Sequence, residues 1–278
     1  MELFDLTAFK ISQLVTKSYS TSFSLATGMM NKERREAIYA IYGFVRLADE
    51  IVDTFHDHDK EAMLDRLESD LKIALDDHIS LNPILHSFQI IVHKYRIPFE
   101  YIEAFLNSMR SDLSKKNYAS KNETDTYIYG SAEVVGLMCL KIFTGGDDNM
   151  FEQLKEPARR LGAAFQKVNF LRDIKCDAEE LGRSYFHHIQ TEEFTEEKKM
   201  LIISDIESDF DAAYQGIKQL PGDAKIAVLL AYYYYQKLLV KLKSTPSREI
   251  KEKRIRVPNS VKMALMVKAV VLAKSNML

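Results

Sequence analysis

Residues 166–177, with the sequence QKVNFLRDIKCD, carry a polar side chain at every third or fourth position. Helical spacing puts one set of these side chains on a single side of a helix, turn over turn: Gln166, Asn169, Asp173 and Asp177, with Arg172 beside them. Apolar residues fall on the other side and suit packing in a core: Phe165, Val168, Leu171 and Ile174. Hard divalent cations take carboxylate and amide oxygens, and a guanidinium binds phosphate. The polar side therefore suits a site for Mg²⁺ and a diphosphate.

A second stretch, residues 42–53 with the sequence YGFVRLADEIVD, repeats this pattern. Asp49 and Asp53 are four residues apart, and Arg46 precedes Asp49 by three. Both stretches therefore read arginine, aspartate, and a further aspartate one helical turn later. Two facing helices of this kind would hold cations between them, while their arginines take the phosphate oxygens.

Aspartates with this spacing are also common on solvated helices, where two like charges cost only about a few tenths of a kcal/mol. The neighbours of Asp49 and Asp53 argue against a solvated helix, because apolar side chains surround nearly all of it: Ala37, Ile38, Tyr39, Ile41, Phe44, Val45, Ile51 and Val52. A carboxylate pair on a buried helix is costly unless a cation meets it. This stretch therefore predicts a buried cation site.

The composition favours an all-α protein. The chain has 278 residues and 46% hydrophobic content, with only 10 glycines and 6 prolines, and long amphipathic runs dominate it. The clearest interior loop is residues 144–149, and Glu156-Pro157 is expected to open the helix that bears Gln166. Fourteen tyrosines and fifteen phenylalanines suggest an aromatic interior, which ordinary core packing largely explains but which would also line an apolar cavity.

A net charge of −2 argues against a nucleic-acid-binding protein. Basic residues are concentrated near the end, however, where residues 241–278 hold ten Lys or Arg against Glu249 and Glu252. This segment is either a patch for anionic lipid, with Lys251, Lys253 and Arg254 at its centre, or a solvated helix face.

Cysteine usage favours a reduced, cytoplasmic compartment, because Cys139 and Cys176 form no Cys-x-x-Cys pattern. The N-terminal residues do not resemble a signal peptide. The longest apolar run, Ile226 to Tyr235, is too short to span a bilayer. The lack of a Gly-rich phosphate loop also argues against a nicotinamide-binding fold.

Taken together, these motifs resemble the squalene/phytoene synthase family of head-to-head prenyl transferases, and most closely its bacterial phytoene synthases. The resemblance covers nearly the whole chain and rests on five segments: Ser20 to Phe23, Tyr39 to Asp53, Val135-Gly136, Gln166 to Asp177, and Gly182-Arg183-x-Tyr185. It implies one all-α domain over residues 1–278, an isoprenoid-synthase helical bundle with a central cavity.

The resemblance also implies roles for individual residues. The metal ligands would be Asp49, Asp53, Asn169, Asp173 and Asp177, binding Mg²⁺ with Mn²⁺ as an alternative. Substrate would contact Tyr19, Ser20, Thr21, Ser22, Phe23, Tyr42, Arg46, Gln166, Arg172, Arg183 and Tyr185. The catalytic group would be Tyr129, Tyr42, Arg46 and Arg172, with Tyr129 near the reacting carbons. NADPH is not expected.

The sequence departs from the family pattern at several positions. The family often has His in place of Tyr19, Asp in place of Glu50, Gly in place of Glu133, and Leu-Pro after the tyrosine that matches Tyr185. Glu50 is expected to lie off the metal face and to have no consequence. Glu133 would put a charge on the helix beside the cavity.

The implied reaction joins two geranylgeranyl diphosphates into phytoene through a cyclopropyl diphosphate intermediate, as in carotenoid biosynthesis. A reductive squalene synthase is disfavoured by the short chain, by the lack of a C-terminal membrane helix and by the lack of a nucleotide motif. Alternatives are squalene, dehydrosqualene or hydroxysqualene synthesis from farnesyl diphosphate.

A non-catalytic helical assembly factor is the alternative of another class, which the intact aspartates and arginines disfavour. Peripheral contact with the inner face of a membrane, through the basic C-terminal third, is a further expectation.

Overall fold

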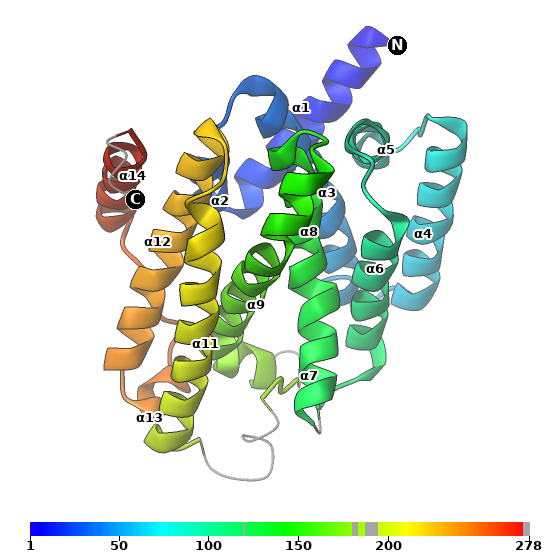
Figure 1. The fold of residues 1–278 in the computed structure, drawn as a ribbon. Coiled ribbons are helices and arrows are strands. Elements are labelled where there is room, and N and C mark those ends of the chain that lie inside the picture. The colour runs from blue at the N-terminus through cyan, green and yellow to red at the C-terminus, as the bar shows by residue number, and fades with distance from the viewer. Residues whose placement is uncertain (119, 180–182, 187–193, 275–278) are drawn as a thin grey trace.

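The computed structural model describes residues 1–118, 120–179, 183–186 and 194–274 (Figure 1). Its helices are α1 (Glu2–Tyr19), α2 (Thr21–Thr27), α3 (Lys32–Asp53), α4 (Lys60–Asp77), α5 (Pro83–Tyr95), α6 (Phe99–Ser114), α7 (Lys121–Ile128), η1 (Tyr129–Glu133), α8 (Val134–Thr144), α9 (Asp148–Glu179), α11 (Glu196–Ile217), α12 (Gly222–Ser244), α13 (Ser247–Ile250) and α14 (Asn259–Lys274). In the described residues the β pairing is limited to one isolated bridge, between Asn117 and Ser184. The predicted all-α fold is confirmed.

The helices pack around α9, which lies against α8, α11 and α12 (Figure 1). On the other side of α8, α3 packs against α1, α5 and α6, and α4 lies at the outer edge. One buried apolar cluster is built mainly from α3, α4, α5, α6 and α8, and a second mainly from α9, α11, α12 and α14. The space between the two clusters lies in the middle of the bundle.

Helix starts follow capping rules that can be read from the sequence. The Asn31 side chain accepts a hydrogen bond from the Arg34 N–H at 3.0 Å and begins α3. Asn82 does the same for α5, with Pro83 at its first position, where a missing N–H is no loss. These caps set the direction in which each helix enters the bundle.

The expected start of the long central helix is wrong. Glu156-Pro157 does not open α9, because α9 already begins at Asp148, where Asp147 Oδ1 accepts from the Met150 N–H at 3.0 Å. Pro157 therefore lies inside the helix. It packs against Gly216 of α11, where an added Cβ would come within 2.3 Å of the proline Cβ. The glycine makes room for the proline ring, and this contact brings α9 and α11 close together.

A wider π turn, η1, interrupts the helical run from α7 to α8. The same run, Lys121–Thr144, is long and apolar enough to cross a membrane, but half of it is buried and it packs against α6 and α9. Ile226 to Tyr235, the longest apolar run in the sequence, lies within α12. Within the described residues, the apolar character of Lys121–Thr144 is explained by its place in the bundle.

Candidate functional site

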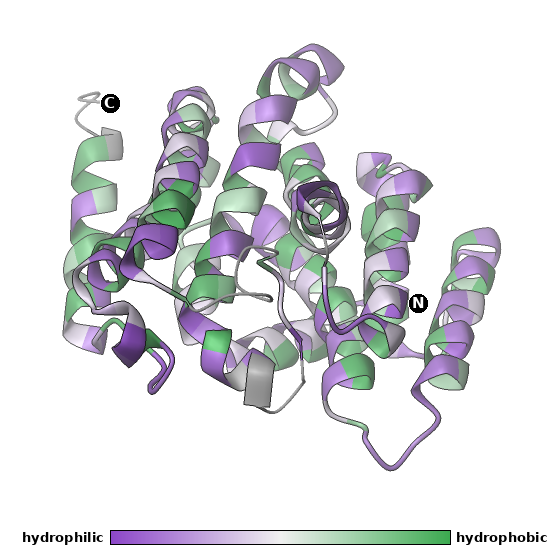
Figure 2. Cartoon of the chain, turned by 90° about the horizontal axis from the view of Figure 1, so that it is seen from below, coloured by the Kyte–Doolittle hydropathy of each residue, from purple (hydrophilic) through white to green (hydrophobic). Residues whose placement is uncertain are grey.

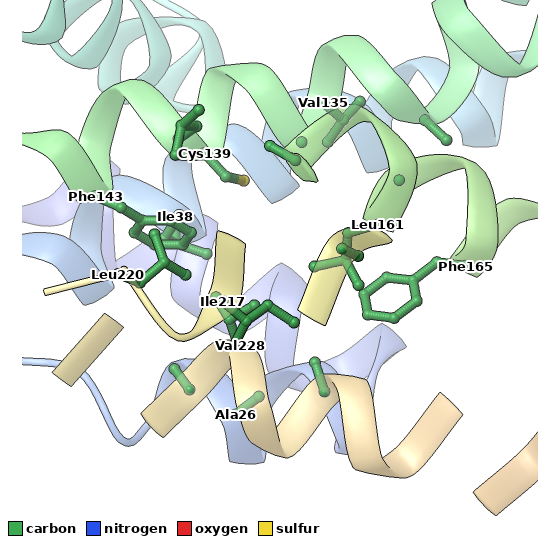
Figure 3. A pocket seen from close by; sticks show the side chains of 18 of the residues that line it. Ala26, Ile38, Val135, Cys139, Phe143, Leu161, Phe165, Ile217, Leu220 and Val228 are labelled. Carbon is green, nitrogen blue, oxygen red and sulfur yellow. The ribbon is translucent and has the colours of Figure 1, made fainter. Parts of the chain in front are cut away.

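An apolar cavity of about 280 Å³ lies between the two buried clusters, and the bundle therefore has the predicted central cavity. Its walls come from α2, α3, α8, α9, α11 and α12. Figure 3 shows side chains from these helices pointing into one space, with Phe165 at one end and Phe143 at the other. Cys139 also lines the cavity, and burial raises the pKa of its thiol to about 12.

The cavity wall continues into the acidic stretches along two helices. On α9, Ala158, Gly162 and Gln166 line the cavity at four-residue spacing, and the same spacing leads on to the acidic residues. On α3, Ile38 and Val45 line the cavity, and Asp49 lies one turn beyond Val45. One end of the apolar cavity therefore adjoins both predicted metal-binding segments.

The arginine of α3 turns toward Glu50. The Arg46 guanidinium donates to the Glu50 carboxylate and lies 3.4 Å from Asp49 Oδ2. The same guanidinium stacks on the Tyr19 ring, with 4.3 Å from Cζ to the ring centre. Glu50 therefore binds the Arg46 guanidinium, a contact that its expected place off the metal face did not indicate; whether it affects activity stays a prediction.

The arginine of α9 turns toward its own aspartate. Arg172 Nε donates to Asp173 Oδ1 at 2.9 Å, and a second nitrogen of the guanidinium contacts Oδ2. Arg254, from the segment after α13, adds a contact of 2.8 Å to the same Oδ1. One turn earlier, Asn169 Oδ1 accepts a hydrogen bond from the Tyr235 hydroxyl at 3.3 Å.

Arg183 joins the two acidic helices. Its backbone N–H donates to the Asp177 carbonyl at 2.7 Å, and its guanidinium donates to Asp53 Oδ1 at 2.9 Å. The other end of the fork donates to the Asp112 carbonyl at 3.1 Å. The guanidinium is thereby held among α3, α6 and the end of α9. The expected left-handed cap at Gly182 lies outside the described residues.

The carboxyl groups at this end influence each other's ionisation. Desolvation raises the pKa of Asp49 to about 6, and the charge of Asp53 adds to the rise. Desolvation also raises the pKa of Asp177 to about 7, and Asp173 and Asp53 contribute to that rise. Since Asp53 is on α3 and Asp177 on α9, the two acidic segments face each other.

The residues present fit a hard divalent cation by their chemistry. All five predicted ligands offer carboxylate or amide oxygens, and Asp49 and Asp177 are desolvated carboxyl groups near other aspartates, so a cation would stabilise their charged forms. Across the described part of the chain, no three His, Cys, Asp or Glu side chains are already grouped to hold one ion. The arginines instead contact Asp53 and Asp173.

The turn from Tyr19 to Phe23 lies beside these groups. Ser20 caps α2 by accepting from the Phe23 N–H at 3.3 Å, and Phe23 lines the cavity. The Phe23 ring stacks on Tyr42, with 4.9 Å between ring centres. Thr21 is exposed and Ser22 partly buried on the same short helix. The turn therefore brings the aromatic ring of Phe23 to the cavity, with hydroxyl groups on the residues just before it.

Two predicted site tyrosines lie elsewhere. Tyr129 does not line the central cavity; it borders a separate groove between α6 and α7, with the Arg159 guanidinium 5.4 Å from its ring centre. Tyr185 is buried and stacks on Phe170 at 4.0 Å. Its position anchors the Arg183 segment. Arg159 also forms an ion pair with Glu133 at 2.7 Å. This ion pair compensates the negative charge that Glu133 places on the helix.

Four residues that the motifs did not single out lie at the acidic end: Asp112, Tyr127, Tyr235 and Arg254. The Tyr127 hydroxyl donates to Asp112 Oδ2 at 2.8 Å, and burial raises the pKa of Asp112 to about 7. Among the described residues, Asp112 Oδ1 and Arg46 Nε are buried without a hydrogen-bond partner. In the sequence, the one sign of this contact was Asp112 itself, an aspartate on the amphipathic helix α6. The sequence did not show which residue Asp112 contacts.

A family model described as squalene/phytoene synthase matches residues 16–198. Curated relatives include phytoene synthase 3 of Zea mays, which is 34% identical over 62% of this chain and 40% of its own length. Phytoene synthase 1 of Solanum lycopersicum is 28% identical over 81% of this chain and 58% of its own length. The phytoene synthase of Arthrospira platensis is 29% identical over 64% and 60%, respectively. The chain thus spans 40% to 60% of the length of these relatives.

Solved structures resemble the fold over almost its whole length. A dehydrosqualene synthase has a TM-score of 0.81 and 22% identity, over 98% of both chains. YisP from Bacillus subtilis has a TM-score of 0.73 and 16% identity, over 96% of this chain and 97% of its own. At these identities the likeness shows the fold alone.

Proposed function

The chain belongs to the squalene/phytoene synthase family, and from that premise we propose that it condenses two prenyl diphosphates head to head. The favoured reaction joins two geranylgeranyl diphosphates into phytoene through a cyclopropyl diphosphate intermediate. Relatives named phytoene synthase from plants and a cyanobacterium support this choice. Synthesis of squalene, dehydrosqualene or hydroxysqualene from farnesyl diphosphate is the alternative within the same chemistry.

The observation that carries the proposal is the junction between an apolar cavity and two facing acidic helices. A prenyl diphosphate has the same two parts, a hydrocarbon chain and a highly charged head. The cavity would take the chain, while the groups on α3 and α9 would take the head. Few other ligand classes need both surfaces in continuity.

The proposed metal ligands are Asp49, Asp53, Asn169, Asp173 and Asp177. Mg²⁺ bound there, or Mn²⁺ in its place, would neutralise the diphosphate and favour its departure. Arg46 and Arg172 would donate N–H groups to the phosphate oxygens, and Arg183 would hold Asp53 in position. These charges act at the place where negative charge develops on the leaving group.

The apolar side of the site would stabilise the carbocations of the reaction and shield them from water. Phe23 lines the cavity and its ring stacks on that of Tyr42, and aromatic faces attract a cation. The apolar walls exclude water, so that an allylic cation meets the double bond of a second chain rather than solvent. Tyr129 has no part in this proposal, because it borders the other groove.

Incubation of the purified protein with Mg²⁺ and geranylgeranyl or farnesyl diphosphate, each with and without NADPH, tests the reaction. We expect a C40 hydrocarbon from geranylgeranyl diphosphate without NADPH. A requirement for NADPH would indicate reductive squalene synthesis instead. No coupled product from either substrate, with a correctly folded protein, would overturn the proposal and favour a non-catalytic assembly factor.

We also propose that α14 places the protein on an anionic membrane surface. Met263, Val267 and Val271 follow one face of α14 at four-residue spacing and are 49%, 59% and 52% exposed. In Figure 2, the helix that leads to the C-terminus is hydrophobic along most of its length. The sequence has no acidic residue after Glu252, so the charge around this face is basic.

The basic loop before α14 is less available than the sequence suggested. Arg254 contacts Asp173, and Lys253 pairs with Glu249 at 2.6 Å. Flotation with phosphatidylglycerol liposomes should therefore be lost in Val267→Asp but kept in Leu201→Asp, a control at an exposed position of α11. Unchanged flotation of Val267→Asp would refute the membrane proposal, as would light scattering that shows α14 covered in a dimer.

A further inference from the structure

The cavity has a measurable depth along two of its helices. On α9 its lining residues run from Gln166 at the acidic end to Leu154, and on α8 and η1 from Ser131 to Phe143. At a rise of about 1.5 Å per residue, both series span about 18 Å. The close approaches of Gly136 to the Ala158 carbonyl and of Gly162 to the Ala132 carbonyl show that α8 and α9 line the same space in opposite directions.

This depth separates prenyl chains of different length. The main chain of a farnesyl group has eleven C–C bonds and extends about 14 Å, whereas that of a geranylgeranyl group has fifteen and extends about 19 Å. A cavity about 18 Å deep leaves the end of a farnesyl chain short of the bottom. It accommodates nearly the whole length of a geranylgeranyl chain.

Three side chains from separate parts of the chain line the bottom of the cavity. Figure 3 shows Phe143, Ile38 and Leu220 gathered at the end of the cavity opposite Phe165. All three are nearly fully buried. They come from the end of α8, from α3 and from the turn between α11 and α12. We name this group of three residues the cavity floor.

Beyond the floor the chain turns to the surface. One residue after Phe143, α8 ends at Thr144, and Gly145 and Gly146 follow in an exposed turn with positive φ values of 62° and 93°. A Cβ added at either glycine would meet nothing within 4 Å. Phe143 therefore lies where the cavity, which it lines, comes near the exposed glycine turn that follows α8.

We propose that the cavity floor, and Phe143 above all, sets the longest prenyl chain the protein accepts, at a length that fits C20. The proposal rests on the proposed condensation and adds to it the residues that select the substrate. A chain that stops short of the floor leaves apolar wall uncovered and buries fewer CH₂ groups, so it binds less tightly. A chain that is too long clashes with the Phe143 ring.

Substitutions at Phe143 should move the length limit in both directions. Phe143→Trp enlarges the floor side chain and should shift the ratio of kcat/KM for farnesyl over geranylgeranyl diphosphate upward by at least tenfold. Phe143→Ala opens the cavity toward the surface turn and should allow turnover of a C25 prenyl diphosphate that the unchanged protein does not use. Ile73→Trp, at an exposed position of α4, is the control and should change neither property.

A binding measurement separates this proposal from the proposed reaction. The chain contains no tryptophan, so Phe143→Trp introduces a single fluorescent reporter at the floor. Unreactive farnesyl and geranylgeranyl thiodiphosphates, titrated with Mg²⁺, should shift its emission. The Ile73→Trp control should not respond.

Each result has a defined consequence. If the tryptophan emission responds to the thiodiphosphates but no variant forms a coupled product, the inference about the cavity floor holds and the proposed condensation is wrong. The contrary result is that products form while Phe143→Trp changes the ratio of kcat/KM for farnesyl over geranylgeranyl diphosphate by less than twofold and Phe143→Ala does not turn over the C25 substrate. In that case the floor does not select chain length, and the inference is wrong. Thermal unfolding followed by circular dichroism establishes that each variant is folded.

Discussion

The two acidic segments of the site, on α3 and α9, hold their arginines in different ways. On α3, Arg46 donates to Glu50 and stacks on Tyr19, while Asp49 receives only a contact of 3.4 Å. On α9, Arg172 closes on Asp173 with two nitrogens. The aspartates of α3 are therefore less neutralised by their own helix than Asp173 is.

Each segment also receives a guanidinium from the chain beyond α9. Arg183 contacts Asp53 on α3, and Arg254 contacts Asp173 on α9. The Arg183 side chain is buried, whereas the Arg254 side chain is 44% exposed. We infer that the α3 segment depends on a buried support, and that the α9 segment carries an additional charge that a ligand can displace at low cost.

The largest expected effect tests whether both segments serve one site. Asp49→Asn and Asp173→Asn should each lower kcat/KM by about a thousandfold, because each removes charge from the place where the leaving group departs. Steady-state kinetics with geranylgeranyl diphosphate measures this loss. Asp76→Asn, at an exposed position of α4, is the matched control. Full activity in either site variant would mean that one helix is dispensable and that the two segments do not act together.

Glu50→Gln tests the arrangement that is particular to α3. Loss of the carboxylate frees Arg46 from its fixed position, and kcat/KM should fall by about 10- to 100-fold, the usual cost of removing a partner that orients an active-site group. Glu36→Gln changes an acid on the same helix that pairs with Lys32 near the surface, and it should have little effect. Equal activity of the two variants would show that Glu50 does not position Arg46.

Tyr127→Phe tests the buried support of the α3 segment. The change leaves Asp112 without its hydroxyl donor, and the free energy of unfolding should fall by about 1 to 3 kcal/mol. Urea denaturation gives this value. Tyr129→Phe is the matched control two residues along, because the ring of Tyr129 makes its contact with Arg159. A comparable loss in both variants would argue against a special role for the Tyr127–Asp112 hydrogen bond.

Arg254→Gln should give the smallest effect. Its partly exposed contact with Asp173 is worth about 0.2 to 1 kcal/mol. The Mg²⁺ concentration that half-maximally raises the melting temperature with inorganic diphosphate should therefore fall by at most about fivefold. Lys253→Gln, one residue earlier, should leave it unchanged. A higher Mg²⁺ requirement would instead place Arg254 among the groups that bind the diphosphate.

Much of the candidate site could be predicted from the sequence, because helical periodicity is a local property. The spacing of Asp49 and Asp53, and of Asn169, Asp173 and Asp177, predicts which side chains share a side of their own helix, and the structure keeps each set together. The apolar surroundings of α3 predict that it is buried. The all-α class follows from the same periodicity and from the scarcity of glycine and proline.

The errors concern neighbours, which periodicity does not specify. Tyr127 lies two residues before Tyr129, the first residue of η1, and both border the groove between α6 and α7. Sequence spacing alone does not say that Tyr127 is the one whose hydroxyl meets Asp112. Pro157 looked like a helix start, because the sequence does not reveal that Gly216 on another helix receives its ring.

Glu50 shows the same limit within one helix. Glu50 and Asp49 are both within reach of Arg46, and the sequence does not determine which carboxylate takes the guanidinium. The sequence by itself determined the helices and the sides on which their charges lie. Tertiary packing alone decided that the two acidic sides meet, that Arg183 bridges them, and that Phe143 lines the bottom of the cavity, because these contacts join residues far apart in the chain.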